Sequence, residues 1–317
     1  MDGSRSRFWS PRLAMTKNRA LWIAFCCVMF CVALMLLDLA RPLFVPLPTK
    51  LGPSVDLTNS THETPVVIQT TSLEQVIHRA TEAGHRFRRD VKDYRARLVK
   101  RERVGSTLMD PQEMSIKIQN RQYDSQYESS LPEQTKFTSG LHAYLRFTSP
   151  ASVAGREVIW VEGKNDDKLT AHEAGILNLM SLDLEPNGTI AMMGSKYPIT
   201  EIGIEKLLDK LIERGRKDSV LEQPEVTVTS GSLFGTVSCD RIRIIHPKKQ
   251  DGFDFHIAEV CIDTKKEIPV YYASYDWPAK EGDSPPLLEE YGYHDLEINV
   301  GLGEADFDKD NSEYHFP

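Results

Sequence analysis

The sequence predicts an α+β domain in which two helices pack on one face of an antiparallel sheet, preceded by one transmembrane helix. Three observations support this fold class. Residues 20–37 carry no charge, two later segments repeat apolar residues at helical spacing, and most other ordered segments alternate apolar and polar residues. A chain of 317 residues, 40% hydrophobic and 26% charged, can bury a sizeable core.

Charge is unevenly distributed along the chain. Five basic residues and Asp2 give residues 1–19 a charge of +4, whereas the whole chain has a formal net charge of −8. The part after residue 37 therefore carries about −12. Because phosphate binding requires a basic surface, this acidic body excludes nucleic acid as an expected partner.

Residues 20–37, ALWIAFCCVMFCVALMLL, predict a single-pass membrane anchor. As a helix this segment spans roughly 27 Å, close to the thickness of a bilayer core. A cleaved signal peptide is the alternative, but Asp38 and Leu39 before Ala40 match a small-x-small cleavage site poorly. The preceding basic residues predict that residues 1–19 are a cytoplasmic tail, with the body in the periplasm and attached to the cell membrane.

Residues 38–70 are rich in Pro, Ser and Thr and have no periodicity, which predicts a flexible linker. We expect residues 71–317 to form one exported domain. Its first helix is predicted in TSLEQVIHRATEAGHRFRRDV, because Ser72 and Gln75 fit a capping box and apolar residues recur at helical spacing. Alternating strands follow, at residues 94–98, 114–118 and 143–147, with a polar insertion at 123–140.

A second amphipathic helix is predicted in PITEIGIEKLLDKLIERGRKD, with Thr200 as its N-cap. Its apolar stripe must be buried, either as simple core or as the lining of a cavity; it consists of Ile204, Leu207, Leu208, Leu211 and Ile212. Phe147, Trp160 and Tyr272 have the same two interpretations. An acyl chain would need such a lining, because it offers no hydrogen bonds and gains about 0.8 kcal/mol per buried CH₂.

The segment EVIWVEGKNDDKLTAH, residues 157–172, is the nearest approach to a catalytic cluster. Asp166, Asp167 and His172 could serve in acid/base or metal chemistry, but the histidine lies five or more residues from either carboxylate. Turn chemistry between two apolar runs instead favours a β-hairpin. The sequence contains no Gly-rich phosphate loop, Cys-x-x-Cys pair or His-Glu-x-x-His element, so we predict no enzymatic activity, cofactor or metal.

Two charged segments also have two interpretations each. Residues 86–103 hold nine basic residues against three acidic ones and could contact anionic head groups, or could be a solvated helix end and strand face. The end of the chain, GEADFDKDNSEYHF, imitates a calcium loop but lacks the glycine and glutamate that such a loop needs. We interpret it as an acidic tail.

Four stretches resemble the bacterial exported family known as domain of unknown function 1571: GREVIWVEGKNDDKL, MSLDLEPNGTIAMMGSKYPITEIGIEKLL, FHIAEVCIDTKKEIPVYYASYDWP and LLEEYGYHDLEINVGLGEADFD. The resemblance covers about residues 73–317. That family is grouped with the lipoprotein carriers LolA and LolB and the envelope-stress regulator RseB. The resemblance therefore implies a strongly curved antiparallel half-barrel, closed on its concave face by helices and able to hold acyl chains.

We accordingly expect a membrane-anchored envelope protein that binds a lipid or a lipid-modified partner in an apolar cavity. The anchor favours a fixed receptor or sensor over a free shuttle. The alternative is an envelope sensor or scaffold that binds a protein partner and has no ligand cavity. The candidate cavity residues are Phe147, Trp160, Ile204, Leu207, Leu208, Leu211 and Tyr272.

Cys239 and Cys261 are a candidate disulfide. The strands VSCDRIRIIHP and FDFHIAEVCID flank the polar loop KKQDG, and a hairpin centred on Gln250 places Cys239 opposite Cys261 and Arg241 opposite Glu259. Facing cysteines in an exported domain can oxidise. Two unlinked thiols are the alternative, because directly opposed strand positions often give strained disulfides.

Overall fold

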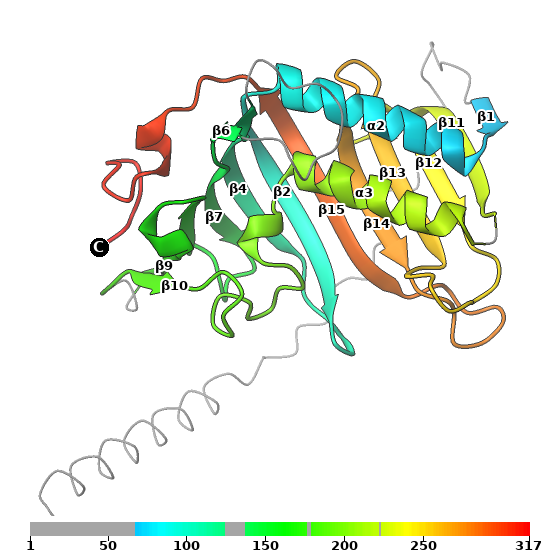
Figure 1. The fold of residues 1–317 in the computed structure, drawn as a ribbon. Helices are drawn as coiled ribbons and strands as arrows, with labels where there is room; N and C mark the ends of the chain where they lie inside the picture. The colour runs from blue at the N-terminus through cyan, green and yellow to red at the C-terminus, as the bar shows by residue number, and fades with distance from the viewer. Residues whose placement is uncertain (1–66, 124–136, 176–178, 222) are drawn as a thin grey trace, which may run out of the picture. The chain divides into compact units, whose positions relative to one another are not determined.

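The structure is a computed structural model that describes residues 67–123, 137–175, 179–221 and 223–317 (Figure 1). The predicted tail, the predicted anchor, residues 38–66 of the predicted linker and most of the polar insertion lie outside these ranges. Among the described residues, no helix is both long and apolar enough to cross a bilayer. The predicted linker extends too far, because Val67–Thr70 form strand β1, which pairs with β11 (Glu225–Phe234).

Thirteen strands of the described residues form one sheet, and every pair of neighbouring strands in it is antiparallel. One meander consists of β2 (Asp93–Val104), β4 (Gln112–Gln119), β7 (His142–Ser149), β8 (Glu157–Val161), β9 (Leu169–His172) and β10 (Leu182–Leu184). The other consists of β11, β12 (Val237–Ile245), β13 (Ile257–Asp263), β14 (Pro269–Tyr275) and β15 (Leu287–Ile298). Pairing of β15 with β2 joins the two meanders, and the sheet stays open between its edge strands β1 and β10.

Three shorter strands complete the sheet structure. β3 (Thr107–Leu108) pairs with β2 beside the main order of strands. β5 (Gln122–Tyr123) and β6 (Phe137–Ser139) form a separate two-stranded sheet at the ends of the predicted polar insertion.

Two helices, α2 (Leu73–Asp90) and α3 (Ile204–Ser219), lie side by side on one face of the sheet (Figure 1). The capping box of Ser72 and Gln75 is confirmed. The predicted cap of α3 is wrong, because Thr200 lies in the 3-10 turn Ile199–Glu201 and Gly203 is the N-cap. Gly203 has a φ of 105°, and the hydroxyl of Tyr94 accepts the N–H of Ile204 at 2.9 Å. The α+β class with helices on one face of an antiparallel sheet is confirmed.

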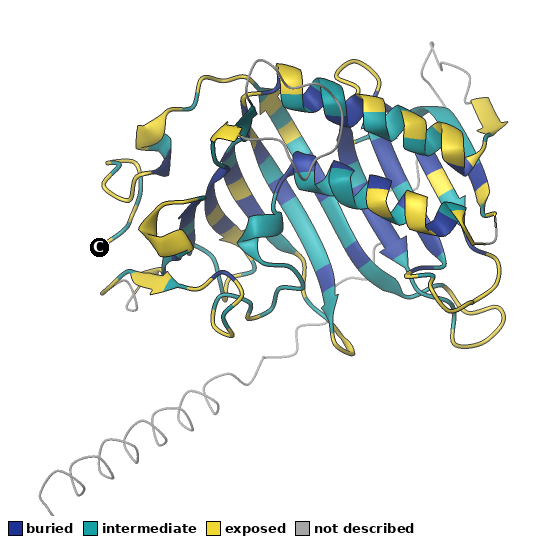
Figure 2. Cartoon of the chain, in the orientation of Figure 1, coloured by how far each residue is buried: buried dark blue, intermediate teal, exposed yellow. Residues whose placement is uncertain are grey.

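The core lies between the helices and the sheet, and Figure 2 shows buried residues on both helices and on the strands behind them. One cluster joins both helices to β2, β4 and β7, and includes Phe87, Ile116, Ala143, Ile204 and Leu208. A second joins them to the other meander through Leu73, Val226, Ile242, Val260 and Tyr272. A third, built on Tyr144, Ile159, Val161 and Phe307, packs the C-terminal segment on β7 and β8.

The predicted hairpin of β12 and β13 exists, but its predicted register is wrong by two residues. Cys239 lies opposite Asp263, and Arg241 lies opposite Cys261. The turn forms at Asp251–Gly252 with φ of 104° at the glycine, and the ring of Phe253 stacks on His246 with 3.9 Å between ring centroids. These contacts shift the turn from the centre that the polar loop alone indicated.

The cysteines are both buried and are free thiols in the structure, placed diagonally rather than directly across the hairpin. Burial, with the neighbouring Cys239, raises the pKa of the Cys261 thiol to about 12. The cross-strand charge pair survives the shift, because Arg241 Nη1 lies 3.2 Å from Glu259 Oε2 along the diagonal.

The hairpin predicted at residues 157–172 has the expected strands, β8 and β9, joined through a 3-10 turn at Asn165–Asp167. Asp166 and Asp167 have positive φ in that turn, a backbone conformation that aspartate adopts readily in turns. His172 faces Glu157 instead, with 3.7 Å between Nε2 and Oε2.

The basic segment at residues 86–103 is largely neutralised by acidic neighbours. Its ion pairs join Arg86 to Glu267, Arg88 to Glu205, Arg95 to Glu297, Arg97 to Asp295 and Lys100 to Glu102. The segment therefore forms a helix end and strand faces with paired charges, in line with the second of its two interpretations.

Candidate functional site

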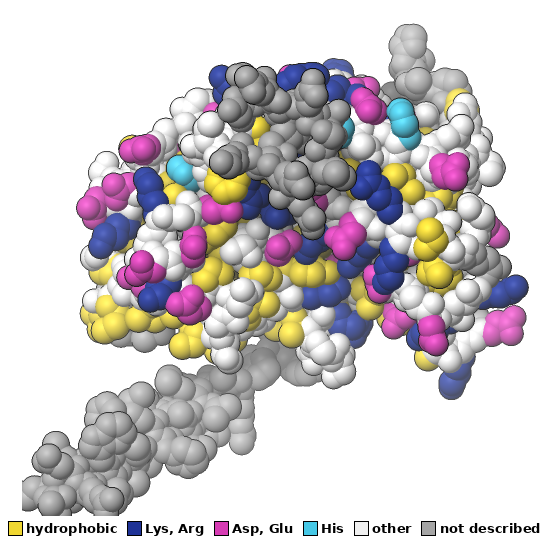
Figure 3. Space-filling view, viewed as in Figure 1, with side chains coloured by type: hydrophobic (Ala, Val, Ile, Leu, Met, Phe, Trp, Pro, Cys, Tyr) yellow, Lys and Arg dark blue, Asp and Glu magenta, His cyan; other side chains and the backbone are white. Residues whose placement is uncertain are grey.

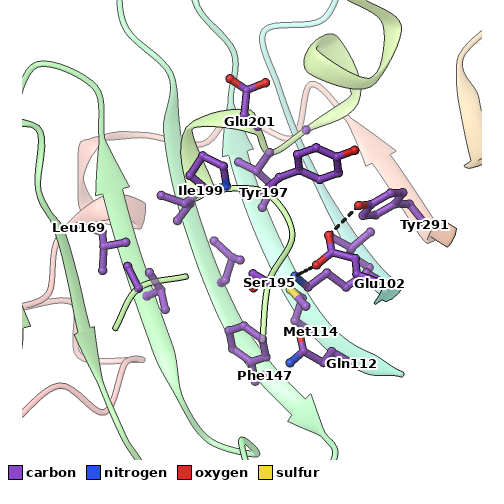
Figure 4. Close-up of a pocket in the computed structure, with 18 of the residues that line it drawn as sticks. Glu102, Gln112, Met114, Phe147, Leu169, Ser195, Tyr197, Ile199, Glu201 and Tyr291 are labelled. Carbon is purple, nitrogen blue, oxygen red and sulfur yellow. Dashed lines mark hydrogen bonds and ion pairs between the residues drawn. The ribbon is translucent and has the colours of Figure 1, made fainter. Parts of the chain in front are cut away.

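A cavity of about 530 Å³ opens between α3, the sheet and residues 185–203, which we call the cover segment (Figure 4). The cover segment contains turns and the 3-10 turn Ile199–Glu201 but no α-helix or strand. Its side chains pack against the first core cluster through Ala191, Ile199 and Ile202. Strands β2, β4, β7, β8, β9, β14 and β15 supply the opposite wall.

Most of the cavity wall consists of apolar side chains. The strands contribute Met114, Leu145, Phe147, Val158 and Leu169, and α3 contributes Leu207 and Leu211. Figure 4 shows Phe147, Leu169 and Ile199 on the side of the cavity away from Tyr291. This part of the site can hold a hydrocarbon group by burial alone.

At the mouth of the cavity, large apolar side chains are exposed to solvent. Met180, Leu182, Ile190 and Met193 all line the cavity, yet they are exposed by 62%, 44%, 61% and 70%. We call these four residues the apolar lip, and Figure 3 shows hydrophobic side chains gathered in this part of the surface, below and beside β10. Exposed apolar side chains that gather in one place are a feature of interaction sites on folded domains.

The end of the cavity near β15 is polar and is organised around the buried carboxylate of Glu289. Lys196 Nζ donates to Glu289 Oε2 at 2.6 Å, the hydroxyl of Tyr197 donates to the same oxygen at 2.9 Å, and Arg214 Nη1 donates to Oε1 at 3.2 Å. Burial opposes ionisation of Glu289, but Lys196 and Arg214 outweigh it and lower the pKa of the carboxyl below its ordinary value. Glu289 is therefore ionised and pairs with two cations, of which Arg214 lines the cavity.

A second buried carboxylate, Glu102, lies beside the first. The hydroxyl of Tyr291 donates to Glu102 Oε1 at 2.6 Å, as drawn in Figure 4. The backbone N–H of Lys196 and the ammonium of Lys100 donate to Oε2 at 2.9 and 3.1 Å. Both glutamates thus tie the cover segment to the sheet.

Two further cations, Lys210 and Arg214, reach the cavity from α3. The Lys210 ammonium lies 3.5 Å from the centroid of the Tyr197 ring and 3.5 Å from Glu201 Oε2. Partial burial lowers the pKa of Lys210 despite the nearby Glu201 carboxylate, and the charge of Arg214 lowers it further. The pKa of Arg214 is raised, because Tyr272 and Glu289 outweigh its burial.

The structure distributes the predicted cavity residues over three environments. Phe147, Leu207, Leu211 and Tyr272 line the cavity. Leu208 instead faces a narrow space of about 60 Å³ between α2, α3 and the strands β12 and β13, which Leu211 and Tyr272 also border. Trp160 and Ile204 line neither space and are buried in the first core cluster.

Sequence reasoning missed the cover segment and the whole polar end. Ile190, Ala191 and Met193 are apolar residues in a stretch without strand or helix period, and that combination was the available signal. Nothing local links Arg214 to Glu289, because the pair forms only through the fold.

In the part of the chain that the structure describes, no group of three or more His, Cys, Asp or Glu side chains is arranged to hold a metal ion. The acidic tail instead uses Asp306 to accept a hydrogen bond from Lys117 at 2.7 Å and another from the N–H of Gly303 at 3.0 Å.

The family described as protein of unknown function (DUF1571) matches residues 91–316, which is most of the chain. The chain therefore belongs to this family, and the resemblance seen in the sequence is confirmed. No curated protein matches the sequence.

Three solved structures to which the chain is similar have low sequence identity. The MucA/MucB complex of Pseudomonas aeruginosa has 12% identity and a TM-score of 0.36, and the match covers 74% of this chain and 60% of that one. A DUF1329 family protein from Desulfovibrio piger has 12% identity and a TM-score of 0.32, with coverage of 73% and 97%. A LolA superfamily protein from Nitrosomonas europaea has 8% identity and a TM-score of 0.29, with coverage of 76% and 99%.

Proposed function

We propose that this protein binds, without catalysis, the acyl chain of a lipid or of a lipid-modified partner in the cavity. The observation that carries the proposal is the continuous apolar surface that runs from the exposed lip into the interior. A volume of about 530 Å³ lies within the range of small-molecule sites. Each CH₂ group that moves from water into such a wall contributes about 0.8 kcal/mol.

The two carboxylates at the polar end support binding rather than catalysis. Both oxygens of Glu102 and both oxygens of Glu289 accept hydrogen bonds from lysine, arginine, tyrosine or backbone donors. A general acid or base needs a position from which it can reach a substrate proton. These two side chains are instead engaged in holding the wall of the site together.

A sensor that binds only a protein partner is the alternative function. A closed and fully packed interior would favour that alternative, whereas the open cavity favours an apolar ligand. The uncharged segment at residues 20–37 supports a membrane-anchored, periplasmic location, in which the lip could receive a chain directly from lipid.

The test begins with the full chain, extracted from its own membranes, and uses mass spectrometry to identify what stays bound. We expect an acyl-bearing molecule to co-purify in a defined ratio. The rate at which a fluorescent fatty acid moves from phosphatidylcholine vesicles to the purified protein then measures uptake of an acyl chain from a bilayer. Recovery of an empty protein that also fails to accept the probe would contradict the proposal.

A matched pair of variants separates the lip from general surface hydrophobicity. The double substitution Met180→Ser and Met193→Ser removes two exposed side chains of the lip, whereas Leu233→Ser removes one that is 64% exposed on β11, outside the cavity. We expect several-fold slower transfer to the lip variant, an unchanged rate for Leu233→Ser, and unfolding temperatures close to that of the unaltered protein for both.

A further inference from the structure

Lys210 and Arg214 stand one helical turn apart on the face of α3 that lines the cavity. Side chains four residues apart on a helix are neighbours, so these two positive charges repel each other. Neither is fully solvated, because the two side chains are exposed by only 29% and 24%. Such a pair favours the binding of a negatively charged group at the polar end of the cavity.

Arg214 is held in place by three partners on the cavity wall. Its Nη1 donates to the hydroxyl of Tyr272 at 2.8 Å and to Glu289 at 3.2 Å, and its Nη2 donates to the hydroxyl of Tyr197 at 3.3 Å. The guanidinium is therefore fixed in orientation before any ligand arrives. A fixed guanidinium is suited to the oxygens of a carboxylate or phosphate.

Lys210 is held less tightly than Arg214. Its ammonium carries three donors, and its carboxylate partner, Glu201, is 3.5 Å away and 34% exposed. The ammonium instead lies against the ring of Tyr197, whose hydroxyl belongs to the Glu289 network. An anion placed between Lys210 and Arg214 would meet both cations without breaking the bonds of Glu289.

Charged side chains gather at this end of the cavity. Lys100, Lys210 and Arg214 line it together with Glu102, Glu201 and Glu289, and Lys196 pairs with Glu289. Lys210 and Arg214 stand on the same helix as the apolar wall formed by Leu207 and Leu211. An amphiphile with an anionic end matches both features at once.

We infer that Lys210 and Arg214 bind the anionic oxygen head group, a phosphate or a carboxylate, of an amphiphile whose acyl chain lies in the apolar part of the cavity. This inference rests on the proposed function of the cavity and specifies its ligand class. The head group lies against α3 near Tyr197, and the chain extends toward Phe147, Leu169 and the lip. Neutral amphiphiles with the same chain lose the charge-assisted hydrogen bonds and keep only the apolar contacts.

Two probes that differ by one phosphate group test the inference on the full chain, kept in solution by a non-ionic amphipol. Monopalmitoylglycerol is neutral, and palmitoylglycerol phosphate adds one phosphate to the same molecule. Calorimetric titration below the micelle concentration should show about tenfold tighter binding of the phosphate ester. High salt should reduce that preference, because part of it is electrostatic.

Substitutions on α3 assign the preference to its residues. Lys210→Gln should remove most of the tenfold preference, because it weakens binding of the phosphate ester far more than binding of monopalmitoylglycerol. Arg216→Gln removes the same charge from an exposed position of the same helix outside the cavity, and should change neither affinity. Arg214→Lys keeps the charge but not the fork of donors, and should weaken the preference partly.

The outcomes separate this inference from the function on which it rests. Equal affinities for the two probes, or a preference that survives Lys210→Gln, would overturn the head-group site and leave acyl-chain binding standing. Failure of both probes to bind would overturn both. Inorganic phosphate alone should compete only weakly, since it lacks the acyl chain; phosphate binding as tight as that of the ester would show a site for a free anion instead.

Discussion

Two regions on the same face of the sheet differ in what covers them. Over β12 and β13, the helices α2 and α3 pack closely and leave a space of about 60 Å³. Over β4, β7 and β8, the irregular cover segment leaves about 530 Å³. A helix presents a regular apolar stripe that can fill the groove beneath it, whereas a segment of turns contacts the sheet at separate points. The site therefore lies beside α3, over the part of the sheet that the irregular cover segment covers.

The largest difference in stability is expected between alanine substitutions of one leucine in each region. Leu208 of α3 is 2% exposed and buried in the first core cluster, so Leu208→Ala should lower the free energy of unfolding by about 2–5 kcal/mol. Leu184 lines the open cavity and is only partly buried, so Leu184→Ala should cost about 1 kcal/mol or less. Urea unfolding of both variants measures the difference, and equal losses would mean that the two regions are packed alike.

The second prediction concerns how the stability that Glu289 contributes at the polar end of the cavity depends on pH. Because the pKa of Glu289 is lowered in the folded state, its contribution to stability is present above its ordinary pKa of 4.5 and is lost as the pH falls through the folded value below it. Glu289→Gln should lower the free energy of unfolding by about 2 kcal/mol at neutral pH. Unfolding at a series of pH values should show this difference shrinking below pH 4.5. A difference that stayed constant down to pH 3 would show that Glu289 is not held as a carboxylate by its cations.

The sequence predicted the two helices because their signals are local: a capping box at Ser72 and apolar stripes at helical spacing. It also predicted the alternating strands and the family. The register of β12 and β13 failed, because an Asp-Gly turn and the stacking of Phe253 on His246 decide it, and neither follows from loop length. The prediction of the N-cap of α3 failed because Tyr94, more than a hundred residues away, accepts the first N–H of the helix.

The candidate site was predictable only in part. Residues of α3 were found because a stripe must be buried, but the stripe divides between the cavity and the tighter space beneath the helices. The polar end depends on Glu102, Lys196, Arg214 and Glu289 meeting across four separate segments. Pairing at such sequence separations leaves no periodic or motif signal in a single sequence.

The smallest effect is expected when an alanine is replaced by the larger leucine in each of the two regions. Ala258 is 3% exposed beneath the helices, so Ala258→Leu should destabilise the domain by about 1–3 kcal/mol through overpacking. Ala171 lines the cavity, so Ala171→Leu should change stability by less than about 1 kcal/mol and reduce the affinity for a palmitoyl probe. Thermal unfolding and probe titration of the two variants provide the comparison. A loss of stability at Ala171 as large as that at Ala258 would show that the cavity is already filled.

The most direct test of the account maps where a bound chain lies. A palmitate analogue with a photoactivatable group near the end of its chain would be bound to the full protein, irradiated, and its attachment sites located by peptide mass spectrometry. We expect labelling in the cover segment and around Phe147 and Leu169, suppressed by excess unlabelled palmitate. Labelling concentrated instead on Val226, Ile242 and Val260 beneath the two helices, or labelling that excess palmitate does not suppress, would contradict it.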